Sequence, residues 1–156
     1  MRARGFTLIE LVITVAIVGL LATAALPLAE IGFRRAKEQD LRSALYAIRT
    51  ALDEYKDAAD AGRIEMELGD SGFPPTLDEL VNGVVDAKSP DAKKMYFLRR
   101  LPRDPFYPDT SVPASETWGL RAYASEPEDP QPGEDVFDVY STSTGVALNG
   151  TSYSTW

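Results

Sequence analysis

Nineteen consecutive residues near the N-terminus, 11–29, carry no charge, and this run constrains the fold more than any other feature. Leu, Ile, Val and Ala dominate it, and as a helix it is long enough to cross a hydrocarbon core about 30 Å thick. Two arginines, Arg2 and Arg4, precede the run. The sequence therefore predicts a membrane-spanning helix, with its N-terminus in the cytoplasm and the remainder of the chain outside.

The remainder of the chain differs in composition from this run. Of the 11 prolines, only Pro27 lies before position 74. The net charge of −8 repels phosphate, so we expect no nucleic-acid partner. The chain has no Cys and no His, which excludes disulfides, thiolate or imidazole zinc sites and Cys or His catalysis. Because it also lacks phosphate-loop, dinucleotide and serine-elbow motifs, we do not expect an enzyme.

A carboxylate, Glu10, interrupts the apolar sequence that starts at Phe6. Such a charge near bilayer depth costs on the order of 3 kcal/mol, so it needs a partner or a task. Three interpretations compete. The segment is a plain single-span anchor, or a secretory signal peptide for which 22–24 (ATA) offers a cleavage site, or an assembly signal.

Residues 5–10 (GFTLIE) favour the assembly signal, because they resemble the cleavage motif of type IV prepilins and type II secretion pseudopilins. The resemblance implies that a prepilin peptidase cuts between Gly5 and Phe6 and methylates the Phe6 amine. In a filament, Glu10 would pair with the Phe6 amine of a neighbouring subunit, since a charged pair offsets the desolvation of each member. Pro27 falls at mature position 22 (27 minus 5), where the family tends to place a helix-loosening proline.

Beyond Gly32, apolar residues recur at steps of four and three, as on one face of a helix. They are Leu41, Leu45, Ile48, Leu52, Tyr55 and Ala59. We expect one helix, roughly 80 Å long, that continues to about Gly62 and packs one face against a small domain. A coiled-coil stalk is the alternative. The expected organisation is a leader (1–5), a transmembrane or filament-core helix (6–31), its amphipathic continuation (32–62) and a globular α+β region (63–156).

Within the globular region, Thr76 and Glu79 form a predicted capping box that opens a second, short helix before a polar loop that runs to about residue 92. Prolines bar a helix from 96–106, whose aromatic residues should lie against the long helix. Segments 118–124 and 135–141 read as strands, the second with Val136, Asp138 and Tyr140 on one face. Asn149-Gly150 predicts a turn. The expected fold class is α+β, a long helix on a small antiparallel sheet, as in type IV pilin-like folds.

Four features of the C-terminal half are similar, in order, to the major pseudopilins of type II secretion systems. They are FPPTLDEL at 73–80, LRRLPRDPF at 98–106, DVFDVYS at 135–141 and the terminal Trp156. That resemblance implies a calcium ion tying the C-terminal loop, and calcium prefers six to eight oxygen ligands. The first candidates are Asp135 and Asn149, followed by Glu126 and Asp129, with Glu128 and Glu134 nearby. The alternative is an acidic loop that is merely solvated.

The resemblance implies a structural subunit of the inner membrane, single-pass, with its C-terminal domain in the periplasm. It would form a helical homopolymer with minor pseudopilins on an inner-membrane assembly platform, and filament growth would export folded proteins across the outer membrane. One alternative is a type IV pilus subunit for adhesion, motility or DNA uptake. Another is a membrane-tethered periplasmic calcium-binding module that never polymerises.

Overall fold

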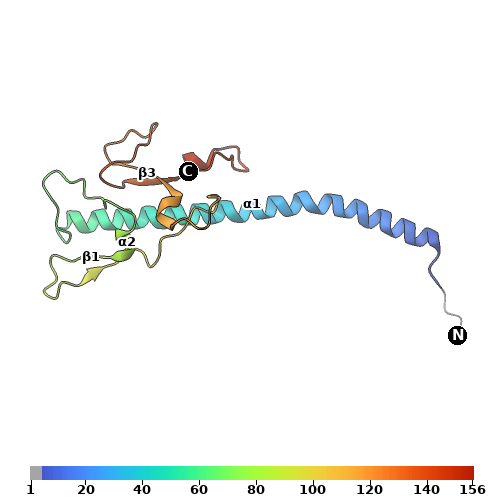
Figure 1. Cartoon of the computed structure of the whole chain (residues 1–156), viewed down its shortest axis with the longest axis horizontal. Coiled ribbons are helices and arrows are strands. Elements are labelled where there is room, and N and C mark those ends of the chain that lie inside the picture. Colours follow the sequence, from blue (N-terminus) through green and yellow to red (C-terminus); the bar gives the residue numbers. More distant parts are fainter. Residues whose placement is uncertain (1–4) are drawn as a thin grey trace. The chain divides into compact units, whose positions relative to one another are not determined.

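The computed structural model describes residues 5–156, apart from the side chains of 24–27, and divides into two compact units, Met1–Ala36 and Lys37–Trp156. Helix α1 (Leu8–Asp60) begins in the first unit and ends in the second (Figure 1). The arginines Arg2 and Arg4 of the expected leader lie outside the described residues. So does the side chain of Pro27, whose backbone belongs to α1.

The C-terminal end of α1 confirms the predicted boundary near Gly62. Gly62 adopts φ +67°. Its N–H donates to the Ala59 carbonyl at 2.8 Å, and the Arg63 N–H donates to the Ala58 carbonyl at 2.9 Å. These two bonds define a Schellman motif, which satisfies carbonyls that a helix end otherwise leaves unpaired.

One face of α1 forms half of the hydrophobic core of the second unit. All six periodic positions are buried, which confirms the predicted face: Leu41, Leu45, Ile48, Leu52, Tyr55 and Ala59. The other half of the core comes from later parts of the chain: Leu77, Leu80, Trp118, Val136, Val139 and Tyr153. Because the chain's own globular region covers this face, the coiled-coil alternative is wrong for this part of α1.

The second helix is shorter than predicted. Helix α2 (Glu79–Asn82) begins at Glu79 itself, and no side chain caps its N-terminus. The expected capping box is therefore wrong, because Glu79 occupies the first turn position instead of the third. Its Oε2 atom accepts a hydrogen bond from the Tyr55 hydroxyl of α1 at 3.3 Å. A small hairpin follows where the sequence predicted only a loop, as β1 (Val84–Val85) pairs antiparallel with β2 (Lys94–Met95).

The second sheet contains the two predicted strands in shorter form. After the 3-10 turn η1 (Ala114–Thr117), β3 (Trp118–Arg121) pairs antiparallel with β4 (Asp138–Ser141), with Trp118 opposite Ser141. The prediction that Val136 shares a face with Asp138 is wrong. Val136 is buried in the core, as is Val139, whereas strict alternation would put these two residues on opposite faces of the strand. Val136 precedes the strand and donates its N–H to the Pro74 carbonyl at 2.8 Å, so the alternation does not reach it.

The proline-rich segment and the C-terminal turn follow expectation. Phe97 packs against Tyr55 of α1 with ring centroids 5.3 Å apart, and Phe106 stacks on Tyr153 at 4.1 Å. Near the C-terminus, Gly150 adopts φ +89° and donates its N–H to Ala147 at 2.9 Å. A short 3-10 turn, η2 (Tyr153–Thr155), then leads to Trp156. The fold is α+β, as predicted.

Candidate functional site

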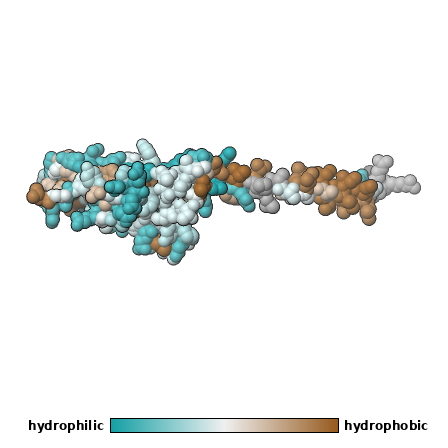
Figure 2. All heavy atoms as spheres, turned by 90° about the horizontal axis from the view of Figure 1, so that it is seen from above, coloured by the Kyte–Doolittle hydropathy of each residue, from teal (hydrophilic) through white to brown (hydrophobic). Residues whose placement is uncertain are grey.

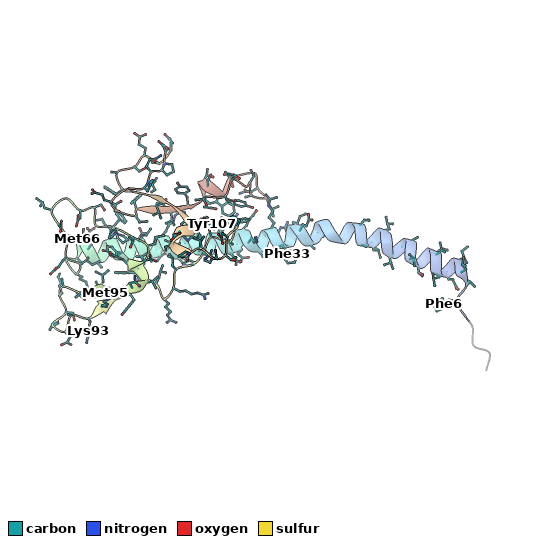
Figure 3. All side chains as sticks on the ribbon, viewed as in Figure 1. Phe6, Phe33, Met66, Lys93, Met95 and Tyr107 are labelled. Atoms are coloured by element: carbon teal, nitrogen blue, oxygen red, sulfur yellow. The ribbon has the colours of Figure 1, made fainter. Side chains whose placement is uncertain are left out.

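The first unit presents an uncovered apolar surface. Helix α1 is long and apolar enough to span a membrane. Every large apolar side chain described from Phe6 to Phe33 is at least 41% exposed, and Phe6 itself is 86% exposed (Figure 3). Figure 2 shows this stretch as predominantly hydrophobic. An apolar surface of this extent requires lipid or another apolar surface as its surroundings.

Thr7 and Glu10 form a reciprocal capping box at the start of α1. Glu10 Oε2 accepts hydrogen bonds from the Thr7 N–H at 2.9 Å and from the Thr7 hydroxyl at 2.8 Å. The Thr7 hydroxyl oxygen in turn accepts the Glu10 N–H at 3.3 Å. This box was not predicted from the sequence, although Thr-x-x-Glu is its signature. Among the described residues, the second Glu10 oxygen, Oε1, accepts no hydrogen bond and so is open to another donor.

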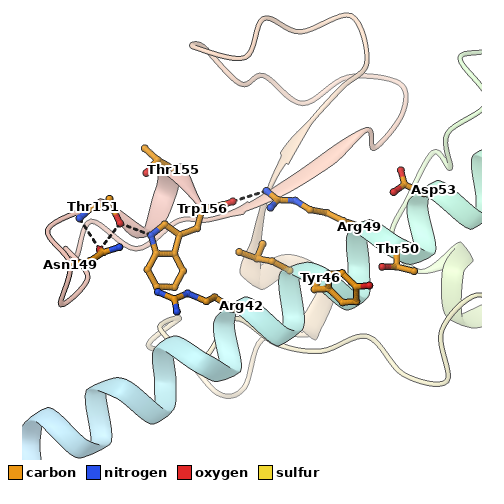
Figure 4. Close-up of a pocket in the computed structure, with 10 residues that line it drawn as sticks. Arg42, Tyr46, Arg49, Thr50, Asp53, Asn149, Thr151, Thr155 and Trp156 are labelled. Carbon is orange, nitrogen blue, oxygen red and sulfur yellow. Dashed lines mark hydrogen bonds between the residues drawn. The ribbon is translucent and has the colours of Figure 1, made fainter.

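Two arginines of α1 hold the C-terminal residue of the second unit. Arg49 donates to Asp138 Oδ1 at 2.7 Å, to the Val139 carbonyl at 3.1 Å and to the Trp156 carbonyl at 2.8 Å. The Arg42 guanidinium lies 4.3 Å from the centre of the Trp156 ring. Figure 4 shows both arginines extending from α1 towards Trp156. They therefore join α1 both to β4 and to the C-terminal segment.

A buried carboxylate one turn earlier completes this attachment. Glu38 Oε1 accepts hydrogen bonds from the Tyr153 hydroxyl at 3.0 Å and from the Leu148 N–H at 2.8 Å. Glu38 and Arg42 are four residues apart, so they lie on the same face of α1, one turn from each other. The contacts of Glu38 were not predicted, because nothing local in a sequence shows which charge of a helix will meet a distant segment.

The candidate calcium ligands do not form one ligand set. Asp135 Oδ1 accepts the Tyr123 N–H at 2.8 Å, Asp129 Oδ1 accepts the Gln131 side-chain amide at 2.8 Å, and Asn149 Oδ1 accepts the Thr151 hydroxyl at 2.8 Å. Asn149 and Asp135 line two different hollows, and Glu126 is exposed. In the part of the chain that the structure describes, no group of three or more Asp, Glu, His or Cys is placed to hold a metal. As arranged, these residues do not fit calcium, and calcium binding stays a prediction.

Structural contacts shift the pKa values of two groups near the C-terminal end of α1, Tyr55 and Asp86. Burial, followed by the neighbouring charge of Glu79 and the hydrogen bond to it, raises the pKa of Tyr55 to about 12. Arg63 donates to Asp86 Oδ2 at 2.6 Å, and this hydrogen bond lowers the pKa of the Asp86 carboxyl. The first contact connects α1 to α2, and the second connects Arg63, which follows the end of α1, to Asp86 in the β1–β2 hairpin.

Two comparisons with known proteins give concordant results. A family profile described as the prokaryotic N-terminal methylation motif matches residues 1–26. The type II secretion system core protein G of Klebsiella pneumoniae is 34% identical over 69% of this chain and 72% of the relative. The protein of the same name from Aeromonas hydrophila is 32% identical, over 67% and 68% respectively. That of Klebsiella michiganensis is 29% identical, over 85% and 88%. No solved structure matches.

Proposed function

We propose a filament-forming function from one premise: this chain belongs to the family of the type II secretion system core protein G. It is accordingly a pseudopilin of such a system. In our proposal, the chain polymerises through the N-terminal part of α1 into a helical filament, whose growth drives folded proteins across the outer membrane. The observation that carries this proposal is the exposed apolar surface between Phe6 and Phe33, with a carboxylate, Glu10, at its start.

The apolar surface suits two successive environments, lipid before assembly and the helices of other subunits afterwards. In the proposed sequence of events, a prepilin peptidase cuts between Gly5 and Phe6 and methylates the new amine. Glu10 Oε1 then accepts a hydrogen bond from that amine on a neighbouring subunit and forms an ion pair with it. Since only one axial stagger brings the two charges together, the pair fixes the register of the filament. Pro27 would loosen α1 between the two ends of this apolar stretch.

We infer that the chain is a single-pass protein of the inner membrane with its second unit in the periplasm, because Arg2 and Arg4 favour a cytoplasmic N-terminus. The partners in this proposal are further copies of the chain, minor pseudopilins, the prepilin peptidase and the inner-membrane assembly platform. The role is structural, not catalytic. Nucleic acid is not among the proposed partners, since the net charge is −8.

Deleting the gene and complementing it with the wild type or with Glu10→Ala tests this function. Secreted proteins are assayed in the medium and in the periplasm, and surface pili are counted in the same cells. We expect secreted proteins to accumulate in the periplasm, pili to remain, and only the wild type to restore secretion. Lost pili with normal secretion would instead indicate a type IV pilus subunit. No change in either would contradict a filament altogether and favour a membrane-tethered module.

Calcium is proposed on the resemblance alone, and the contacts of Asp135 and Asn149 do not support it as placed. Calorimetric titration with calcium, with magnesium as the control, tests it directly. Binding that raises the melting temperature and is lost in Asp135→Ala would support a calcium site. Equal melting temperatures with calcium and with a chelator would leave the acidic loop as a solvated surface.

A further inference from the structure

A groove of about 700 Å³ runs along the exposed side of α1 in the second unit (Figure 4). One wall is α1 itself, and the other is the C-terminal segment. The residues that matter for its chemistry are Arg42, Tyr46, Arg49, Asp53, Asn149 and Trp156. None of them belongs to the apolar surface between Phe6 and Phe33, so the proposed helix packing leaves the groove unused.

The charge and aromatic surface of this groove indicate what it would bind. Tyr46 is 76% exposed although it is a large aromatic side chain. Arg42 is exposed and stacks on Trp156, and it forms no ion pair with any described residue. Arg49 is already paired with Asp138, and Asp53 lies about three turns from Arg42 along α1. The Arg42 end therefore offers a cation stacked on the Trp156 ring, with no acidic partner among the described residues and with the exposed Tyr46 ring one turn further along α1. A cation beside exposed aromatic rings suits an acidic segment that contains proline.

The same chain carries a segment of that chemistry elsewhere on its surface. After Arg121 the sequence contains six acidic residues and no Lys or Arg. The loop 125–134 holds four of them, all exposed, together with three prolines: Glu126, Glu128, Asp129 and Glu134, and Pro127, Pro130 and Pro132. No residue of this loop lines the groove of its own chain.

The loop is ordered before any contact is made. The Gln131 N–H donates to the Ser125 hydroxyl at 2.8 Å, and that hydroxyl donates to the Asp129 carbonyl at 3.1 Å. The Ala122 N–H donates to the Gln131 carbonyl at 3.0 Å, which closes the base of the loop. A segment already fixed in shape loses less conformational entropy on binding than a mobile one.

We propose that the groove around Arg42 binds the acidic loop 125–134 of a second copy of the chain. The loop and the groove are different surfaces of the same molecule, so the contact is head-to-tail and, within the proposed helical filament, repeats from one subunit to the next. This inference rests on the proposed function, because it is the filament that keeps second units close together and allows a weak charged contact to form. The apolar helices hold the subunits, and the groove and loop add a contact outside the membrane.

Cysteine cross-linking tests the contact without interference, since the natural chain has no Cys. Two differently tagged full-length chains are co-expressed, one with Tyr46→Cys and one with Glu128→Cys, and are then oxidised during filament assembly. We expect a mixed dimer that carries both tags. Lys93→Cys replaces Tyr46→Cys as the control, since Lys93 lies at the β1–β2 hairpin and outside the groove (Figure 3).

Charge reversal then tests the chemistry of the contact. Arg42→Glu on the Tyr46→Cys chain should lower the yield of mixed dimer about five- to tenfold. Glu126→Arg on the other chain should restore it, which it could not do if Arg42→Glu had only damaged folding. Lys93→Glu, with the same change of charge, should leave the yield unchanged. Filaments that assemble without a mixed dimer, or a yield that ignores Arg42→Glu, would overturn this inference and leave the proposed function intact. Absence of wild-type filaments would overturn both.

Discussion

Glu10 combines two properties that a substitution can separate. Its Oε2 atom caps the first turn of α1 through Thr7, and its charge is available to a neighbouring amine through Oε1. A glutamine can occupy the third position of a capping box, as a glutamate does, but carries no charge. Comparing glutamate with glutamine at position 10 therefore separates the capping role of this side chain from the role of its charge in assembly.

We expect Glu10→Gln to be inserted and processed normally but to assemble as poorly as Glu10→Ala. The physical reason is that the amide keeps the cap and loses the ion pair. Processing is followed by gel mobility and assembly by counting filaments in electron micrographs. Thr7→Ala is the matched control: it weakens the cap by about 1 kcal/mol and keeps the charge, so it should assemble. Normal filaments from Glu10→Gln would show that the charge has no role.

Tyr55 gives a second prediction, for alkaline pH. Burial raises its pKa from 10.0 to about 12, so the folded state binds the proton more tightly than the unfolded state. Its contribution to stability is complete below about pH 10 and is lost as the pH rises towards 12. We expect Tyr55→Phe to reduce the fall in melting temperature over this range. Parallel melting of wild type and variant at a series of pH values measures the difference, and identical pH profiles would contradict the prediction.

Among the secondary-structure elements, the end of α1 depends on one backbone conformation. Gly62 has a positive φ, which residues with a Cβ adopt only at a cost. A Cβ at this position would meet only the Lys88 side chain, at 3.8 Å, which is ordinary contact. Any effect of substitution therefore comes from the backbone and not from crowding.

We expect Gly62→Ala to lower the free energy of unfolding by about 1 kcal/mol, because alanine strains the left-handed conformation. Gly62→Asn should cost less, since asparagine tolerates that conformation better than alanine. Urea unfolding of the full chain in detergent, followed by circular dichroism, measures both. Equal losses in the two variants would mean that the Schellman motif is not what ends α1.

The sequence predicted long elements well and short ones poorly, for a physical reason. A helix face repeats over six positions from Leu41 to Ala59, so its period is clear without tertiary information. Strands of two residues such as β1 and β2 contain no period, and α2, with four residues, is too short for its cap to be read from spacing. The Arg42 and Arg49 contacts were unpredictable for a related reason: their partners lie more than 80 residues away.

For the chain as a whole, polarity is divided between the two units. The first unit exposes apolar side chains. The second unit contains, after Arg121, a stretch with acidic residues and no Lys or Arg. An acidic exterior favours solubility outside the membrane and repels polyanions. The filament that we propose would accordingly be apolar inside and acidic outside.

We expect the purified full chain not to retard duplex DNA in gel electrophoresis, even at low salt, where charge effects are strongest. The net charge of −8 is the reason. A basic DNA-binding protein of similar size serves as the positive control. Retardation that salt abolishes would contradict this prediction and favour a role in DNA uptake.

The attachment of the C-terminal segment to α1 also dictates an order of folding. Arg49 is 107 residues from Trp156, and Glu38 is 115 residues from Tyr153, so these contacts close long loops that contain nearly all of the second unit. Contacts so far apart in sequence form late, after local helix formation. The buried face of α1 is therefore covered only after almost the entire chain has become available for folding. During this interval the pseudopilin is a chain with an open core, the state that proteases and chaperones would encounter.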